Sequence, residues 1–152
     1  MAITESDGDR IDLGVLDSLV GYHMRRAMGA FNVDYARAVA GTPIRQGLFA
    51  VMSVIAANPG ISQGIVGKAL GIQRANMVAL ITELSELGFI DREPSATDRR
   101  AFNLTLTEKG AVMLKDTLAR IQDHEERMLA ALSPAARQSL IVVLGTIAAV
   151  EE

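Results

Sequence analysis

Four consecutive residues contain side chains that are well suited to reading the hydrogen-bonding pattern of another molecule. Gln73, Arg74 and Asn76 carry amide and guanidinium groups, and small Ala75 lies among them. Such groups form paired hydrogen bonds with the edges of adenine or guanine in the major groove of DNA. Ordinary solvated residues at a helix start have the same composition, so this segment alone is weak support for base contacts.

Two other groups have side chains that suit contacts with phosphates or with a narrow groove. Asp98, Arg99 and Arg100 put two guanidiniums beside one carboxylate, which could orient an arginine towards the negative minor groove of DNA. The same run could instead be a solvated charged turn. Ser62 and Gln63 could bind a phosphate through a hydroxyl and backbone N–H groups, although Ser62 could also be a plain helix cap.

The elements that would position these residues follow from the spacing of apolar side chains. Apolar residues recur every three or four positions in six segments, which is the pattern of amphipathic helices. We expect helices at 13–39, 43–57, 62–71, 73–87, 108–132 and from 133 to the last residues. At 89–93 and 102–106 the apolar residues no longer follow the helical period, and we expect two short strands there, joined by a polar hairpin. The fold class is therefore mainly α with a small β wing.

Cap residues define two of the helix starts. Thr42 is expected to be the N-cap of the second helix, with Pro43 at the first helical position, where its missing N–H costs little. Thr105 and Glu108 have the spacing of a capping box, which predicts the start of the fifth helix.

The order of helix, tight turn, helix and two-stranded ribbon is the plan of a winged helix-turn-helix. Gly67 would let the third and fourth helices cross closely, and Gly71 would permit the sharp turn between them. We assign this plan to 43–106 of one domain that covers 1–152, with dimerisation helices at 13–39 and 108–151. The apolar stripes of those outer helices favour pairing with a second chain, although they could also pack on each other within one chain.

Composition excludes several classes of protein. A chain of 152 residues suits one compact domain, and the absence of cysteine excludes disulfides and thiol-based redox sensing. No apolar run approaches the ~20 residues of a membrane-spanning helix, and the polar, acidic N-terminus lacks an export signal. We therefore expect a cytoplasmic location and no membrane partner. The net charge of -3 does not argue against DNA binding, because phosphate contacts need only one basic face.

The sequence contains few features that are typical of an enzyme or of a metal site. It has no glycine-rich phosphate loop and no nucleophile motif, and its two histidines, His23 and His124, lie far apart. The candidate metal cluster joins His124 to Asp123, Glu125 and Glu126, but neighbouring residues on a helix point in different directions. We interpret this segment as a solvated face of the fifth helix, and we expect no catalytic residue, no metal and no cofactor.

Several motifs in the same order resemble the MarR family of bacterial transcription regulators, and the resemblance extends from about residue 13 to the C-terminus. The motifs are Asn58–Gln63, Leu70–Ile72 with Arg74, Leu84–Ile90, Asp98–Arg100 and Leu104–Gly110. The resemblance implies a homodimer, assembled by the first, fifth and sixth helices, that binds a palindromic operator in double-stranded DNA and usually represses. It also implies that Asp98 steadies the wing while Arg100 enters the minor groove. Ala75, Asn76 and Ala79 differ from the family's usual residues, which points to an unusual base preference.

The resemblance further implies a small-molecule effector, often an aromatic acid or phenol, that binds between the dimerisation helices and the reading domain. Tyr22, His23 and Arg26 on the first helix, with Arg45 and Phe49 on the second, could hold an anionic aromatic ligand. The arginine-rich first helix is similar to that of members that govern aromatic-acid catabolism, some of which respond to aromatic acyl-coenzyme A thioesters.

Other readings remain open at this point. Tyr22 and His23 could be interface or core residues, and Arg26 could be solvated or face DNA phosphates. For the whole chain, the alternative is a winged-helix module that binds proteins, or an activator without a small-molecule effector.

Overall fold

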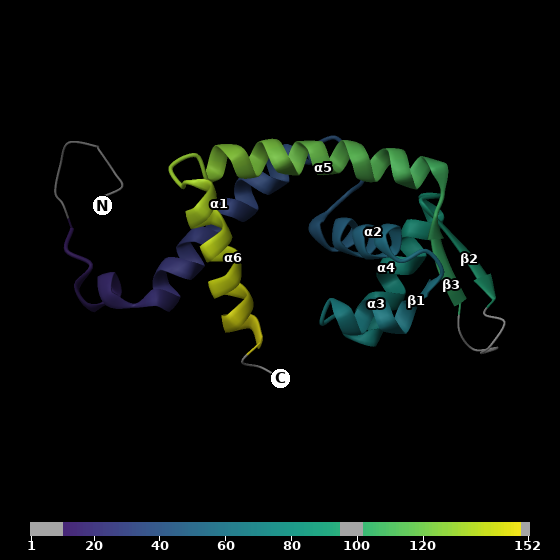
Figure 1. Cartoon of the computed structure of the whole chain (residues 1–152), viewed down its shortest axis with the longest axis horizontal. Coiled ribbons are helices and arrows are strands. Elements are labelled where there is room, and N and C mark those ends of the chain that lie inside the picture. Colours follow the sequence, from purple (N-terminus) through teal and green to yellow (C-terminus); the bar gives the residue numbers. More distant parts are fainter. Residues whose placement is uncertain (1–10, 95–101, 150–152) are drawn as a thin grey trace.

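The computed structural model describes residues 11–94 and 102–149, which form mainly helices and one small sheet. The elements in chain order are η1 (Gly14–Ser18), α1 (Val20–Ala38), α2 (Gln46–Ala57), β1 (Ile61–Ser62), α3 (Gln63–Ala69), α4 (Arg74–Glu86), β2 (Ile90–Pro94), β3 (Phe102–Leu106), α5 (Glu108–Met128) and α6 (Pro134–Ala148). Helix α5 runs between two parts of the molecule, with α1 and α6 at one end and α2, α3, α4 and the sheet at the other (Figure 1). The expected fold class is confirmed.

The second of these parts, which we call the winged lobe, consists of α2, α3, α4 and the sheet, and it contains the main hydrophobic core. All three strands are antiparallel in the order β1-β3-β2, with Ile61 opposite Leu104 and Ile90 opposite Leu106. Side chains from every element of the lobe meet in the core, and its fully buried members include Leu48, Met52, Ile55, Val66, Met77, Ile81, Leu84, Phe89 and Leu104.

The first helix is not continuous from residue 13 to residue 39, as the spacing predicted. A short 3-10 helix, η1, precedes α1, and the backbone of Leu19 between them is extended. In a continuous α-helix the carbonyl of Asp17 would accept the N–H four residues later. Here it lies 3.0 Å from Nε2 of His23, which donates to it in place of a backbone N–H. The side chain therefore replaces a helical hydrogen bond at the break.

Helix α2 begins three residues later than expected. Thr42 is not its N-cap, because the Thr42 hydroxyl donates to the Val39 carbonyl at 2.8 Å and accepts the Ile44 N–H at 3.2 Å. These two bonds close a local turn, so Pro43 lies before the helix and Arg45 takes the cap position without a side-chain bond. A hydroxyl that bonds its own neighbours competes with helix capping.

The sheet and the start of α5 also differ from the expectation. The two-residue strand β1 was not predicted, since it is too short to produce an alternating pattern. Thr105 lies in β3, and Thr107 is the N-cap of α5, where its Oγ1 accepts the Gly110 N–H at 2.9 Å. The same hydroxyl donates to the Gly88 carbonyl at 2.7 Å, which joins the start of α5 to the end of α4.

His124 is buried, which corrects its interpretation as part of a solvated face. Its side chain lies on the face of α5 that packs on α1, and the residue is only 2% exposed. Nδ1 donates to the Asp34 carboxylate at 2.7 Å, and Phe31 and Tyr35 lie edge-on to the imidazole. Arg127 also donates to Asp34 at 3.1 Å, and the hydrogen bond from His124 is the main cause that lowers the pKa of this carboxyl. This cluster attaches α1 to α5.

None of the helices at 11–94 and 102–149 is long and apolar enough to cross a membrane. Within the same residues, no three side chains of the metal-ligating kinds come together in a way that would hold a metal ion.

Candidate nucleic-acid interface

The turn between α3 and α4 is as tight as the glycines predicted. Gly71 has a φ of 63°, a conformation that only glycine adopts readily, and the Ile72 N–H donates to the Gly67 carbonyl at 2.8 Å. Gly67 is buried, and a Cβ at this position would lie 3.3 Å from the Ile72 carbonyl and 3.4 Å from the Met77 side chain. The two helices therefore cross at a distance that a larger residue at position 67 would increase.

Beside this turn, the winged lobe has an open hollow of about 610 Å³ between α3, α4 and the sheet. Polar, basic and apolar side chains line it together. The lining residues are Ser62, Gln63, Gly64, Gly67, Lys68, Ile72, Arg74, Met77, Val78, Arg92 and Phe102. No acidic residue is among them, so the hollow suits an anionic molecule.

Of the side chains that were expected to read bases, Arg74 lines this hollow. Arg74, Ala75 and Asn76 form the exposed first turn of α4. Gln73 is the N-cap, but its amide makes no capping hydrogen bond, so it does not serve the helix itself. The first turn thus presents its guanidinium and amide groups outward.

The other residues expected to contact DNA divide into two sets. The hydroxyl of Ser62 accepts the Ile65 N–H at 3.4 Å, so Ser62 does cap α3, and with Gln63 it also lines the hollow. The predicted wing contacts, Asp98, Arg99 and Arg100, lie outside the described residues.

Arg92 and Phe102 line the hollow and were missed by sequence reasoning. The register places Arg92 opposite Leu104 and Pro94 opposite Phe102, so Arg92 and Phe102 are diagonal neighbours on one face of the sheet. The Arg92 guanidinium lies 4.6 Å from the centroid of the Phe102 ring, which is a cation–π contact. A sequence signal existed, because an alternating strand pair places these two residues on the same face once the register is known.

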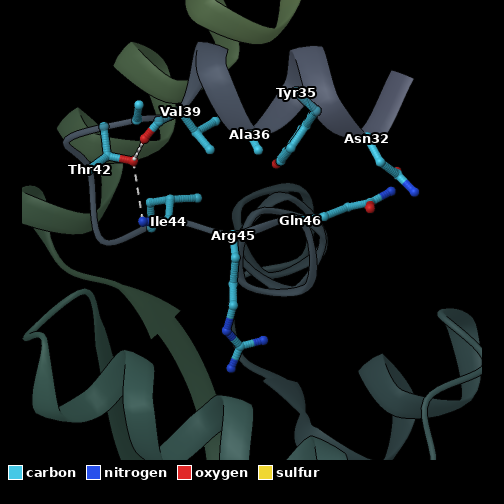
Figure 2. Close-up of a pocket in the computed structure, with 9 residues that line it drawn as sticks. Asn32, Tyr35, Ala36, Val39, Thr42, Ile44, Arg45 and Gln46 are labelled. Atoms are coloured by element: carbon cyan, nitrogen blue, oxygen red, sulfur yellow. Dashed lines mark hydrogen bonds between the residues drawn. The ribbon is translucent and has the colours of Figure 1, made fainter. Parts of the chain in front are cut away.

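A second cavity lies between α1 and the start of α2 and has a volume of about 410 Å³. Figure 2 shows Asn32 and Tyr35 projecting from α1 towards α2, with Val39 directly after the helix, whereas Arg45 extends its guanidinium away from α1. The Tyr35 hydroxyl is buried without a hydrogen-bond partner among the described residues, and burial raises the pKa of Tyr35. The Arg45 guanidinium pairs with Glu83 of α4. The cavity is therefore connected to the reading helix by one ion pair.

The five residues expected to bind an effector do not come together within one chain. Arg45 lines the cavity, and Phe49 packs against the core of the winged lobe. Tyr22, His23 and Arg26 instead form their own cluster on exposed α1, where Arg26 donates to the Tyr22 hydroxyl at 3.4 Å and the two rings lie edge to face. Sequence reasoning missed Asn32 and Tyr35, which lie on the same helix and nearer to Arg45.

Comparisons with known proteins agree with this geometry. The model of the MarR family matches residues 49–101, which cover most of the winged lobe. A protein from Thauera aromatica, described as a transcriptional regulatory protein for the hcr operon, is 33% identical over 132 residues, which are 86% of this chain and 80% of that protein. This chain belongs to the MarR family.

Solved structures of MarR-family regulators extend the match to nearly the whole chain. The transcriptional repressor CouR bound to a 23-mer DNA duplex is 33% identical, with a TM-score of 0.86 over 92% of this chain and 99% of that one. CouR bound to p-coumaroyl-CoA is 32% identical, with a TM-score of 0.78 over 91% of this chain and 97% of that one. The PcaV regulator from Streptomyces coelicolor is 23% identical with a TM-score of 0.83, a likeness of fold. The chain is accordingly a DNA-binding transcription regulator of the winged-helix type rather than an enzyme.

Proposed function

We propose that this MarR-family regulator is a homodimeric repressor that binds a palindromic operator and is released by an anionic aromatic effector. The observation that carries the proposal is the hollow beside α4, which combines Lys68, Arg74 and Arg92 with the polar start of α3 and contains no acid. Because phosphates dominate affinity for DNA and base edges supply specificity, this arrangement suits both. The likeness to CouR bound to a DNA duplex supports DNA binding and the repressor role.

Within this proposal, the first turn of α4 contacts base edges and the start of α3 contacts the backbone. Gln73, Arg74 and Asn76 would bind bases, with Ala75 allowing close approach. Ser62 and Gln63 would bind a phosphate. We extend the contact to Asp98, Arg99 and Arg100, where Asp98 would steady the wing and the arginines would enter the minor groove.

A gel shift against DNA upstream of the chain's own gene tests this assignment. Arg74→Ala should cost about 1–3 kcal/mol and relax base choice, because it removes a base contact, and Arg100→Ala should weaken binding to all sequences. Arg120→Ala is the matched control, because Arg120 lies on α5 and pairs only with Asp116 in the described structure. A wild-type chain that ignores this DNA and neighbouring promoters at low salt would contradict the proposal.

Apolar surface on the helices outside the winged lobe supports the proposed homodimer. Neither α1 nor α6 contains a buried residue, although both are rich in apolar side chains. Five consecutive apolar residues at 140–144 are exposed, so they point in all directions around α6. Exposed apolar patches of this kind mark interfaces, and a second copy of the chain would bury them.

The oligomeric state in solution tests the dimer. Ile141→Glu should convert the dimer to a monomer in sedimentation experiments, since it puts a charge into the proposed interface. Val112→Glu is the control, because Val112 is 66% exposed and Ile141 is 64% exposed, but Val112 lies on α5 near the winged lobe. A wild-type chain that sediments as a monomer would overturn this part of the proposal.

The effector is proposed to bind in the cavity between α1 and α2. A volume of about 410 Å³ accommodates an aromatic acid, and Tyr35 offers an unused hydroxyl at its wall. An effector anion would attract the Arg45 guanidinium away from Glu83 and so remove a link that holds α4. Because α4 contains the base-reading residues, a change in its position would weaken operator binding. The likeness to CouR bound to p-coumaroyl-CoA supports this class of ligand.

The two forms of the effector, a free acid and an acyl-coenzyme A thioester, are distinguished by the cluster at Tyr22, His23 and Arg26. Arg26 precedes Tyr35 by nine residues, or about 14 Å along the helix, so the cluster is too far away to touch a small acid beside Tyr35. It is within reach of the phosphates of a thioester whose acyl group lies in the cavity. Titration with p-coumaric acid and with p-coumaroyl-CoA tests this distinction. Arg45→Ala should weaken the binding of both ligands. Arg26→Ala should weaken the binding of the thioester alone. Unchanged affinity for both ligands in Arg45→Ala would contradict the site.

A further inference from the structure

The outward face of α4 is apolar from Ala75 to Thr82, although it is exposed. Ala75, Val78, Ala79 and Thr82 are all exposed, and their spacing places them on one face of the helix. The largest of these side chains, Val78, is 47% exposed. The opposite face supplies the core through Met77, Leu80, Ile81 and Leu84. A strip of methyl groups thus points away from the lobe.

Charged groups lie beside this apolar strip. Val78 lines the hollow together with Lys68, Arg74 and Arg92, which come from three different elements. The surface therefore combines apolar groups on one helix face with cations beside it. The major groove of DNA has the complementary arrangement, because its base edges lie between two rows of phosphates.

Among the four bases, thymine alone carries a methyl group in the major groove, and alanine and other methyl-bearing side chains contact it. The helix rises about 6 Å from Ala75 to Ala79, which is close to two base steps of about 3.4 Å. We propose that α4 recognises thymine, with the C5-methyl groups of two or three neighbouring thymines in each half-site packed against Ala75, Val78 and Ala79. The inference rests on the proposed function, in which α4 enters the major groove.

In this arrangement, two parts of α4 recognise bases through different kinds of contact. The first turn, with Arg74 and Asn76, contacts base edges by hydrogen bonds. From Val78 onward the exposed face has no amide or guanidinium group up to Thr82, so apolar contact replaces hydrogen bonding there. The half-site therefore contains a position read by polar groups next to a run of thymines.

Uracil in place of thymine tests the inference, because it removes the methyl group and keeps the base pair. The full-length chain is first used to enrich duplexes from a random-sequence pool. An enriched duplex is then made again with single uracils, and affinities are measured by fluorescence anisotropy at one salt concentration. We expect a loss of about fourfold for each methyl group that is buried, at two or three positions in each half-site.

A protein variant links this effect to α4. Val78→Ala should reduce the thymine-to-uracil affinity ratio at one position per half-site, while Val112→Ala, at another exposed valine, should leave every ratio unchanged. Equal affinity for thymine and uracil at all positions would overturn the inference and leave the proposed operator binding intact. A ratio that Val78→Ala does not change would also overturn it. Failure to enrich any duplex would overturn the proposed function together with the inference.

Discussion

Gly110 occupies the closest approach between α5 and the rest of the winged lobe, and its replacement by alanine should destabilise the protein. A Cβ at this position would lie 2.0 Å from the Phe89 carbonyl oxygen, about 1.4 Å short of the 3.4 Å at which ordinary contact begins. The obstacle is backbone, which cannot rotate away as a side chain would. Moving α5 outward would strain the bond from the Thr107 N–H to the Phe89 carbonyl, now 3.0 Å, and the bond from the Thr107 hydroxyl to Gly88.

The magnitude follows from three terms. Alanine is favoured over glycine within a helix by about 1 kcal/mol. Overpacking costs about 1–3 kcal/mol, and the two hydrogen bonds of Thr107 contribute about 1 kcal/mol each. We therefore expect Gly110→Ala to lower the free energy of unfolding by about 2–4 kcal/mol.

Urea unfolding followed by circular dichroism measures this change, with the protomer concentration held constant because dimer stability depends on it. Gly64→Ala is the matched control, since Gly64 lies in helix α3 and a Cβ there would meet nothing within 4 Å. The control should be unchanged or up to about 1 kcal/mol more stable. A Gly110→Ala variant as stable as the wild type would refute the reasoning, because α5 would then not approach Phe89 as closely as the structure has it.

Substitutions at three further positions have expected outcomes that separate structural roles from functional ones. Asp34→Asn should be less stable than the wild type at neutral pH. Because the folded pKa of Asp34 lies below its ordinary 3.8, this difference in unfolding free energy should disappear as the pH falls through that lowered pKa. Tyr35→Phe should leave unfolding free energy unchanged or higher, since the buried hydroxyl has no partner in the described structure, but should weaken effector binding about tenfold in calorimetric titration. Ser62→Ala should cost about 1 kcal/mol of stability, while Ser62→Asp should keep the cap and lose DNA affinity in a gel shift; equal DNA affinity in Ser62→Asp would exclude a phosphate contact.

The winged lobe was largely predictable because its signals are local. Helix α4 and the strands β2 and β3 lie within one or two residues of the predicted bounds, and the turn at Gly71 has the left-handed backbone that the glycine implied. Apolar spacing within a short segment directly reports which face is buried. The predicted N-cap of α2 was wrong for a local reason too, since a threonine before a proline can close a turn as well as start a helix.

Contacts between distant parts of the chain were predicted less well than local structure. Arg45 meets Glu83, 38 residues later, and His124 meets Asp34, 90 residues earlier. His124 has charged neighbours in sequence, and the pattern around it therefore favoured solvent. Only the packing of α5 on α1 encloses its ring.

The amino-acid sequence by itself determined the order of the α-helices and of the strands β2 and β3, the tight turn at Gly67 and Gly71, and the polar first turn of α4. These properties depend on backbone preferences and on the periodicity of neighbouring residues. The tertiary structure alone decided that Arg92 lies over Phe102, that the Tyr35 hydroxyl faces a cavity, and that an apolar strip on α4 is left uncovered. The physical reason is that burial depends on how helices and strands pack against each other, and no local pattern specifies those distances and angles.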